Sequence, residues 1–360
     1  MTLALSHGGT TMYSSEEPST EVLVGTLRGV SILEHTAQGW SVIHQALEDF
    51  HIQALIFEED SGLWIAGGYN VAGVHVSADG GRTWEQRNEG LKQTNVYSLA
   101  TAKVNGRARL FAGTEPVHVF YSDDLGASWT EFSSLRSVPS VPEWRFATRL
   151  FGGHAKHINF DPYDSNVIYV SVEQGALLKS SDAGQTWEEL PVAHPDLHRT
   201  VIDPRNPKRI FAPGGIGLFV TSDGGQTWEH WMTREHEVGA YPDQLVFQPS
   251  NPDVMFIAAS HTGPRSWRRT GTADAKIARS IDGGRTWEIL RNVYPQELHG
   301  NIEAMCLEEA GGTVSLFAGT TDGEVLWSHD GGDHWSTIVT GLAPISKGIH
   351  AAMLAGLIAV

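Results

Sequence analysis

The stretch S-I-D-G-G-R-T-W at residues 280–287 opens on a hydroxyl, turns at an Asp-Gly-Gly corner and closes on a tryptophan. Near-copies recur along the chain, and a degenerate one, L-E-H-T-A-Q-G-W, ends at Trp40. Successive motif tryptophans are 41 to 59 residues apart, a period typical of propellers built from repeated four-stranded units. The near-copies occupy residues 77–84, 122–129, 180–187, 221–228 and 328–335.

Each repeat also divides into short segments with the composition of β-strands. The third repeat reads V-Y-S-L-A-T-A, R-L-F-A-G-T, H-V-F-Y-S and S-W-T-E-F, which are β-branched or aromatic runs bounded by Gly, Asp and Asn. Seven motif positions therefore predict an all-β fold, a seven-bladed β-propeller of four-stranded antiparallel blades. We expect one domain over residues 1–360.

The first repeat shows only three clear strands before Phe50, so its blade needs a fourth strand from elsewhere. We expect the C-terminal stretch I-H-A-A-M-L-A-G, which begins at Ile349, to supply it. Pairing of N- and C-terminal strands would close the ring and remove two exposed sheet edges. The alternative is that T-L-A-L-S, from Thr2, supplies the strand.

The six motifs resemble the Asp-box, or BNR, repeat of sialidases, sortilin-type propellers, xyloglucanases and photosystem assembly factors, within the WD40/YVTN/BNR-like superfamily. The resemblance covers residues from about 22 to 340 and implies a propeller, but it says little about chemistry because many functions use this fold. The Arg-Ile-Pro element of sialidases does not occur here. Asp-box xyloglucanases use two propellers with catalytic aspartates facing across a cleft, and this chain has room for one.

The Asp-box itself reads as a structural turn. Asp and Ser at a Gly-Gly corner satisfy backbone N–H groups locally, and glycine permits the positive φ that the turn requires. The tryptophan buries a large apolar surface between blades. We therefore interpret the motif aspartates as structural, with calcium binding as the alternative; they are Asp79, Asp124, Asp182, Asp223, Asp282 and Asp330.

Composition excludes several classes of partner. The formal net charge of −17 makes nucleic acid and anionic membrane surfaces unfavourable partners. A single cysteine, Cys306, excludes an intramolecular disulfide and fits a reducing compartment. No signal-peptide pattern or nucleotide-binding fingerprint is evident, so we expect a cytoplasmic protein without a nucleotide cofactor.

Two insertions mark the face on which we expect the site. In a four-stranded antiparallel blade, alternate connections lie on opposite faces, so residues 135–153 and 261–275 both fall on the face away from the Asp-boxes. Long loops on a rigid scaffold frequently bind ligands. Their tryptophans and arginines predict a small anionic or aromatic ligand, although surface ion pairs and edge covering would explain them equally well. The predicted substrate-binding residues are Trp144, Arg145, Arg149, Arg265, Trp267 and Arg268.

Histidines gather at the predicted starts of the innermost strands. Neutral imidazole is the commonest transition-metal ligand, and imidazole with a carboxylate suits Zn, Fe, Mn or Ni. We assign His157 and Glu303 as catalytic; polar lining of a funnel is the alternative. Aligned turns place His198 level with Lys156 and turn it away from His157 unless a bulge intervenes. The predicted metal ligands are His51, His157, His198, His261, His299 and His350.

These observations predict an enzyme that acts on a small anionic or aromatic molecule at a His-lined funnel mouth, as a metal-assisted hydrolase or lyase. The alternative is a non-catalytic propeller that binds a protein or ligand. A sialidase-like glycosidase is the third hypothesis. The oligomeric state is left open.

Overall fold

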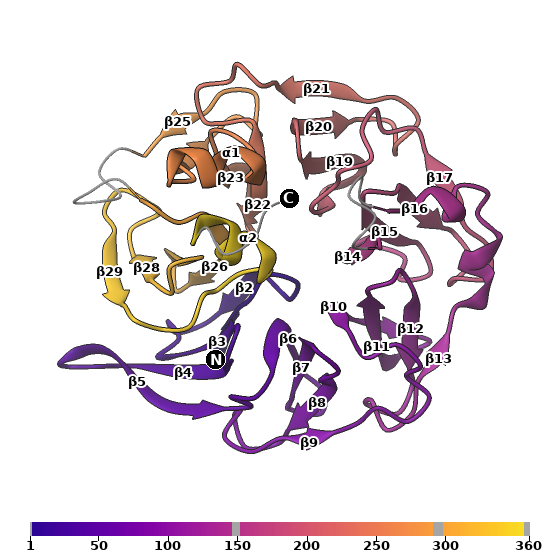
Figure 1. The fold of residues 1–360 in the computed structure, drawn as a ribbon, viewed down its shortest axis with the longest axis horizontal. Helices are drawn as coiled ribbons and strands as arrows, with labels where there is room; N and C mark the ends of the chain where they lie inside the picture. The colour runs from indigo at the N-terminus through magenta and orange to yellow at the C-terminus, as the bar shows by residue number, and fades with distance from the viewer. Residues whose placement is uncertain (1, 146–151, 291–297, 356–360) are drawn as a thin grey trace. The chain divides into compact units, whose positions relative to one another are not determined.

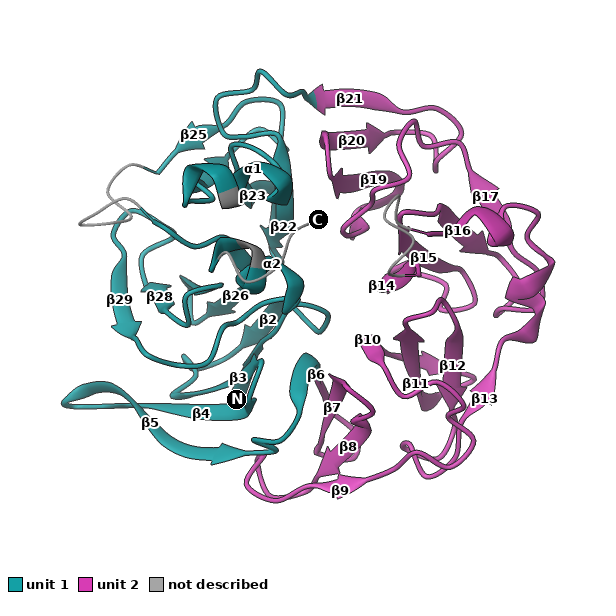
Figure 2. Ribbon diagram, viewed as in Figure 1, with its two compact units in different colours: residues 1–55, 232–360 teal, residues 56–231 magenta. Residues whose placement is uncertain are grey.

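The computed structural model describes residues 2–145, 152–290 and 298–355. Seven sheets, mainly antiparallel and each of at least four strands, confirm the seven-bladed β-propeller fold (Figure 1). The chain divides into two compact units, residues 1–55 with 232–360 (unit 1) and residues 56–231 (unit 2), coloured separately in Figure 2. Each unit is described by itself below, and a single domain over the whole chain stays a prediction.

Unit 1 contains three sheets and two short helices. The helices are α1 (Pro264–Thr270) and α2 (Ile349–Leu354). The sheets, in strand order, are β1 (Thr2–Leu5), β3 (Glu21–Thr26), β4 (Gly29–Thr36) and β5 (Gly39–Ala46); β22 (Tyr241–Gln248), β23 (Asn251–Ser260), β24 (Ala275–Ser280) and β25 (Glu288–Ile289); and β2 (Met12–Ser15), β26 (Ile302–Ala310), β27 (Thr313–Thr320), β28 (Val325–Ser328) and β29 (Ser336–Val339).

Unit 2 contains the other four sheets and two 3-10 turns, η1 (Ser133–Ser137) and η2 (Val141–Glu143). The division of the chain falls within the strand β6. The sheets, in strand order, are β6 (His51–Glu58), β7 (Leu63–Tyr69), β8 (Gly73–Ser77) and β9 (Glu85–Gln86); β10 (Val96–Val104), β11 (Arg107–Thr114), β12 (Val119–Ser122) and β13 (Thr130–Glu131); β14 (His154–Phe160), β15 (Ile168–Glu173), β16 (Leu177–Ser180) and β17 (Glu188–Leu190); and β18 (Val201–Asp203), β19 (Asn206–Gly214), β20 (Gly217–Thr221) and β21 (Glu229–Met232).

The expected C-terminal closing strand is wrong. Residues 349–354 form the helix α2, and β1 supplies the fourth strand of the first sheet by pairing in parallel with β3, from Thr2↔Glu21 to Leu5↔Val24. The next stretch, β2, pairs in parallel with β26. Leu3 and Leu5 are fully buried, so apolar burial favours the N-terminal strand. Alanine, methionine and leucine in the C-terminal stretch favour a helix.

The Asp-box turns satisfy their own donors. In the copy at residues 280–287, the Ser280 hydroxyl donates to Asp282 Oδ1 (2.8 Å) and accepts the Gly284 N–H (2.8 Å). Asp282 accepts the backbone N–H of Thr286 (2.9 Å) and its hydroxyl (2.7 Å). The indole of Trp287, only 9% exposed, donates to the Gly284 carbonyl (3.1 Å). These contacts agree with the structural interpretation of the motif.

Replacing Asp282 with alanine is expected to lower the free energy of unfolding by about 1–2 kcal/mol at pH 7, because the turn loses several side-chain acceptors. Hydrogen bonds from the backbone and hydroxyl of Thr286 hold the pKa of Asp282 at about 2. An unfolded aspartate titrates near pH 4, so the contribution is complete above pH 4 and is lost as the pH falls towards 2.

Urea unfolding at pH 7, 4 and 2.5 measures this effect. The exposed Asp49→Ala variant is the control and should unfold like the wild type. A deficit in Asp282→Ala that stays constant down to pH 2.5 would contradict the role of the carboxylate.

Candidate functional site

Four innermost strands carry a β-bulge at an equivalent position. The pairing register skips one residue at Tyr97 in β10, Lys156 in β14, Asp243 in β22 and Glu303 in β26. A bulge redirects a side chain that regular alternation would otherwise turn away, and bulges are enriched beside active sites. Three of the four redirected side chains are charged. The bulges therefore build the polar clusters of both units.

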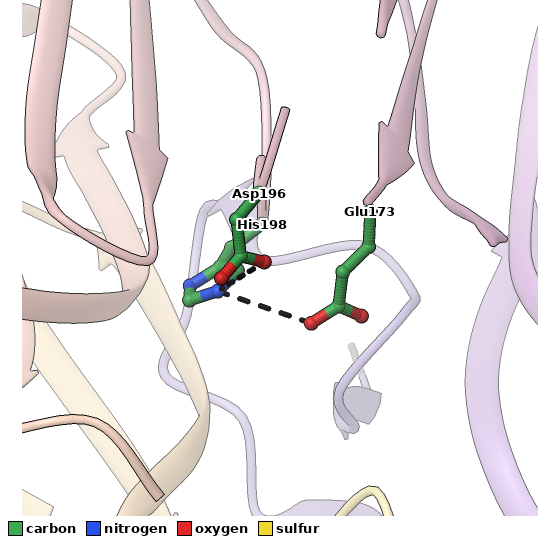
Figure 3. A group of neighbouring side chains, drawn as sticks. All are labelled: Glu173, Asp196 and His198. Carbon is green, nitrogen blue, oxygen red and sulfur yellow. Dashed lines mark ion pairs between the residues drawn. The ribbon is translucent and has the colours of Figure 1, made fainter. Parts of the chain in front are cut away.

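In unit 2, one histidine faces two carboxylates. Glu173 is the last residue of β15, and Asp196 and His198 lie in the loop that precedes β18. His198 Nε2 is 3.5 Å from Asp196 Oδ1 and 3.9 Å from Glu173 Oε1. Figure 3 shows both carboxylates turned towards the imidazole. The side chains of His198 and Glu173 are 0% and 4% exposed, whereas that of Asp196 is 16% exposed, which leaves one side of the cluster open to solvent.

Backbone contacts fix the loop that carries these residues. The His198 N–H donates to the Pro213 carbonyl (2.9 Å), and the Gly215 N–H donates to the Asp196 carbonyl (2.8 Å). A Cβ at Gly215 would lie 2.0 Å from Asp196 Oδ2, and one at Gly214 would lie 2.3 Å from the Asp196 carbonyl oxygen. The two glycines of the G-G-I-G turn therefore allow Asp196 to approach β19 closely.

Further charged groups surround the unit 2 cluster. Lys156 Nζ lies 2.9 Å from Glu173 Oε1. His154 Nδ1 lies 2.8 Å from Glu115 Oε2, and its Nε2 is 3.9 Å from Glu173 Oε2. Burial alone would raise the pKa of Asp196, but its interaction with His198 outweighs burial and holds the pKa below the ordinary value. Asp196 is therefore ionised at neutral pH.

His157, predicted as a catalytic residue and metal ligand, is held on another side of the strand. Its Nε2 is 3.2 Å from Arg199 Nη1, and its Nδ1 accepts the Thr200 N–H at 3.3 Å. His198, by contrast, shares Glu173 with Lys156, at the level the sequence alignment predicts. Within the described residues, the three-residue group around His198 does not include His157.

In unit 1, Glu303 forms a second group with Asp243 and His350. Lys347 Nζ lies 2.8 Å from Asp243 Oδ1, and His350 Nδ1 contacts Glu303 Oε1 directly. Burial would raise the pKa of Glu303, but His350 and Lys347 more than offset it and lower that pKa to about 2. Each carboxylate of this cluster thus has its own nitrogen-bearing neighbour, the Lys347 ammonium for Asp243 and the His350 imidazole for Glu303.

The six predicted metal ligands do not form one group among the described residues. His198 and His350 each join two carboxylates, in different units. His299 is 52% exposed and lies 2.9 Å from Asp322, and His261 is exposed at the end of β23. His51 is buried and lies 2.9 Å from the Ser346 carbonyl. The structure therefore offers one histidine per cluster, where the sequence predicted several.

His51 provides a pH-dependent prediction. Burial lowers the pKa of His51 to about 4, although its contact with the Ser346 carbonyl acts in the opposite direction. An unfolded histidine binds a proton near pH 6.5, so stability is complete above pH 6.5 and falls, by about 3 kcal/mol in all, as the pH drops towards 4.

An NMR titration of the ring should show His51 neutral at pH 5.5. The His51→Gln variant should lose this part of the acid sensitivity. A midpoint near 6.5 would contradict the prediction.

The insertions place their tryptophans in the core. Trp267, in α1, is 0% exposed, and Trp144 is 8% exposed with its indole N–H 3.0 Å from the Ser140 hydroxyl. Stacking of either indole on a ligand would require a neighbouring segment to move. Arg145 and Arg265 are exposed and open to solvent. Arg149 and the side chain of Arg268 lie outside the described residues.

Sequence reasoning missed Glu173 and Asp196. A signal for Glu173 exists at the last position of the second strand, where other repeats carry Thr114, Ser260 and Thr320. A glutamate in a place where three other repeats hold a hydroxyl is a chemical outlier. Asp196 lies in a loop with no counterpart to compare, so its role depends on the folded backbone.

Comparisons with known proteins agree with the fold. A family model described as "Sortilin, neurotensin receptor 3" matches residues 175–295. The photosystem II assembly lipoprotein Ycf48 of Synechococcus sp. (strain CC9902) is 22% identical over 73% of this chain and 68% of its own. The xyloglucanase Xgh74A of Acetivibrio thermocellus is 26% identical over 69% of this chain, which spans only 33% of that protein.

A solved structure agrees as well. The GH74 xyloglucanase of Xanthomonas campestris superposes with a TM-score of 0.65 at 19% identity, over 94% of this chain and 55% of that one. Among the described residues, no helix has the length and apolar character needed to cross a membrane. The seven sheets make the chain a β-propeller, and these matches show its similarity to other proteins of that fold.

Proposed function

We propose that this propeller is a metal-assisted hydrolase of a small anionic substrate, with Glu173, Asp196 and His198 as the metal ligands. The observation that carries the proposal is the spacing around His198 Nε2, 3.5 Å to Asp196 and 3.9 Å to Glu173. Hydrogen bonds would bring these atoms to about 2.7–3.2 Å. Ligand atoms held about 2.1 Å from one tetrahedral ion lie roughly 3.4 Å apart, which is close to the observed spacing.

The donor set fits a catalytic ion. One imidazole nitrogen and two carboxylate oxygens suit Zn, Mn or Fe, and three protein ligands leave a position open for water. A bound ion of this kind lowers the pKa of its water to near neutrality. Asp196 already keeps its charge at neutral pH, and its partly exposed side chain gives access from solvent.

The neighbouring residues of this chain have distinct tasks in such a site. Glu115 lies 2.8 Å from His154 Nδ1 and so orients the imidazole, whose other nitrogen faces Glu173. His154 is therefore placed to carry a proton to or from substrate. Lys156 adds positive charge beside Glu173, which favours an anionic substrate.

The xyloglucanase relative supports hydrolysis as the reaction class, although this chain spans only a third of it. A glycosidase without metal needs one carboxylic acid whose pKa is raised so that it can donate a proton. The pKa of Asp196 is lowered instead, so Asp196 does not fit the role of that acid.

Metal analysis tests the proposal. Protein purified without chelators should contain close to one transition-metal ion per chain by mass spectrometry of the elements. Activity should then appear on a panel of phosphate esters, carboxylic esters and aryl glycosides, disappear with chelator and return with Zn or Mn. Folded protein that takes up no metal at any concentration tested would overturn the proposal.

A non-catalytic binding propeller is the second candidate. Lys156 already lies against Glu173 at 2.9 Å and can balance its charge without an ion. The assembly lipoprotein Ycf48 supports this candidate, since the match spans 68% of that protein. Metal-free, folded protein without activity on the panel would favour a binding function.

A further inference from the structure

A separate cluster in unit 1 has the composition of a site for a cation. Asp243 and Glu303, re-aimed by the bulges of β22 and β26, are 1% and 0% exposed. Asn301 Nδ2 joins them, at 2.9 Å from Asp243 Oδ2 and 3.3 Å from Glu303 Oε1. Two buried carboxylates held this close need positive charge between them.

That charge comes from residues 345–354, here named the C-terminal segment. Lys347 places its ammonium 2.8 Å from Asp243 Oδ1 and donates its backbone N–H to Glu303 Oε2 at 2.8 Å. Its side chain is 2% exposed. His350 of the same segment contacts Glu303. The carboxylates thus belong to the sheets, whereas Lys347 and His350 belong to a segment outside every sheet.

The walls around the ammonium resemble those of an amine-binding pocket. The Tyr241 ring centroid is 5.7 Å from Lys347 Nζ, within the range of a cation–π contact. The ammonium therefore has a carboxylate at hydrogen-bond distance and an aromatic ring nearby, two kinds of partner that favour a cation.

The C-terminal segment is held by contacts that lie outside the sheet ladders. Its backbone bonds to the rest of unit 1 include Ile345 N–H to the Thr320 carbonyl (3.1 Å), and its Ser346 carbonyl accepts from His51 (2.9 Å). The helix α2 has six residues and packs on α1, with ring centroids of Trp267 and His350 5.1 Å apart. Release of this segment would uncover the carboxylates without breaking a sheet.

We propose that Asp243, Glu303 and Tyr241 form a binding site for a primary ammonium group, which Lys347 fills as an internal ligand. A small alkylammonium compound competes with Lys347 and displaces the C-terminal segment. A metal ion suits this cluster less well than the cluster of unit 2, because Lys347 contacts both carboxylates, Asp243 through its ammonium and Glu303 through its backbone N–H. The inference is independent of the proposed hydrolase function.

The test compares full-length wild type with Lys347→Ala by titration calorimetry with n-butylammonium, and with uncharged n-butanol as a matched probe. Without its internal competitor, Lys347→Ala should bind butylammonium at least tenfold more tightly than wild type. The double variant Asp243→Asn/Lys347→Ala should lose this binding. The proposal would be overturned if wild type and Lys347→Ala bound butylammonium equally well, or if Lys347→Ala bound butanol as tightly as butylammonium.

Hydrogen exchange of the wild type keeps the test decisive if Lys347→Ala does not fold. Saturating butylammonium should accelerate exchange of the amides in residues 345–354, and butanol should leave it unchanged. Unchanged exchange with butylammonium would overturn the proposal. An Nα-acetyl-lysine amide, used as a third probe, distinguishes a peptide-borne ammonium from a free amine. Chelator should alter none of these results, because the proposed metal ligands lie in unit 2.

Discussion

Replacing His198 with alanine is expected to lower metal affinity by about 100-fold or more and to abolish metal-dependent hydrolysis. Loss of a residue that only supports a ligand already costs 10- to 100-fold, so loss of the single imidazole ligand should cost at least the upper end. Elemental analysis after dialysis against a fixed metal concentration measures the first effect. The rate on the best substrate of the panel measures the second.

The control for this variant is His299→Ala. His299 is exposed and lies beside a carboxylate, Asp322 at 2.9 Å, but it belongs to no three-residue group among the described residues. It should retain full metal content and rate. If His299→Ala loses the metal and His198→Ala retains it, the site lies at the predicted strand mouth and the cluster around Glu173 is structural. Circular dichroism should show both variants folded.

Much of the fold could be predicted because the Asp-box is a local structure. The contacts of Ser280 and Asp282 are completed within seven residues, so each copy of the motif forms its turn locally. The spacing between copies therefore predicts the number of strands in each repeat. The closing strand could not be predicted in the same way. Burial of Leu3 and Leu5 against β3 decides it, and the repeat pattern does not record that choice.

The candidate sites depend on contacts that lack a sequence signature. The register alignment correctly placed His198 level with Lys156, and it depended only on the aligned turns. Asp196 was missed because it lies in a loop that close contacts with Gly214 and Gly215 hold in place. A Cβ at position 215 would clash with the Asp196 carboxylate, so glycine is needed there for Asp196 to occupy its observed position. The sequence predicted several histidines at one mouth, whereas each three-residue group among the described residues contains one histidine.

The buried pair Asp243–Lys347 should dominate the stability of unit 1. Replacing Asp243 with asparagine is expected to cost about 3–5 kcal/mol, because it breaks a buried ion pair and leaves the Lys347 ammonium short of its carboxylate. Adding Lys347→Met to that variant should recover part of the loss, since no unpaired charge then remains in the core. The urea midpoints of the wild type, both single variants and the double variant form the cycle that measures this coupling.

A second Lys–Asp ion pair, with nearly the same contact distance but an exposed position, shows whether burial or distance sets the coupling. Lys103 Nζ lies 2.9 Å from Asp60 Oδ1, and Lys347 Nζ lies 2.8 Å from Asp243 Oδ1. The side chains of Lys103 and Asp60 are 64% and 53% exposed, whereas those of Lys347 and Asp243 are 2% and 1% exposed. Water screens the exposed pair, so the same cycle on Lys103→Met and Asp60→Asn should leave the urea midpoint unchanged. Equal coupling in the two cycles would show that the interior around Asp243 is hydrated. The Lys347 ammonium would then not be a buried ligand of Asp243, and the proposal that an external ammonium replaces it would lose its basis.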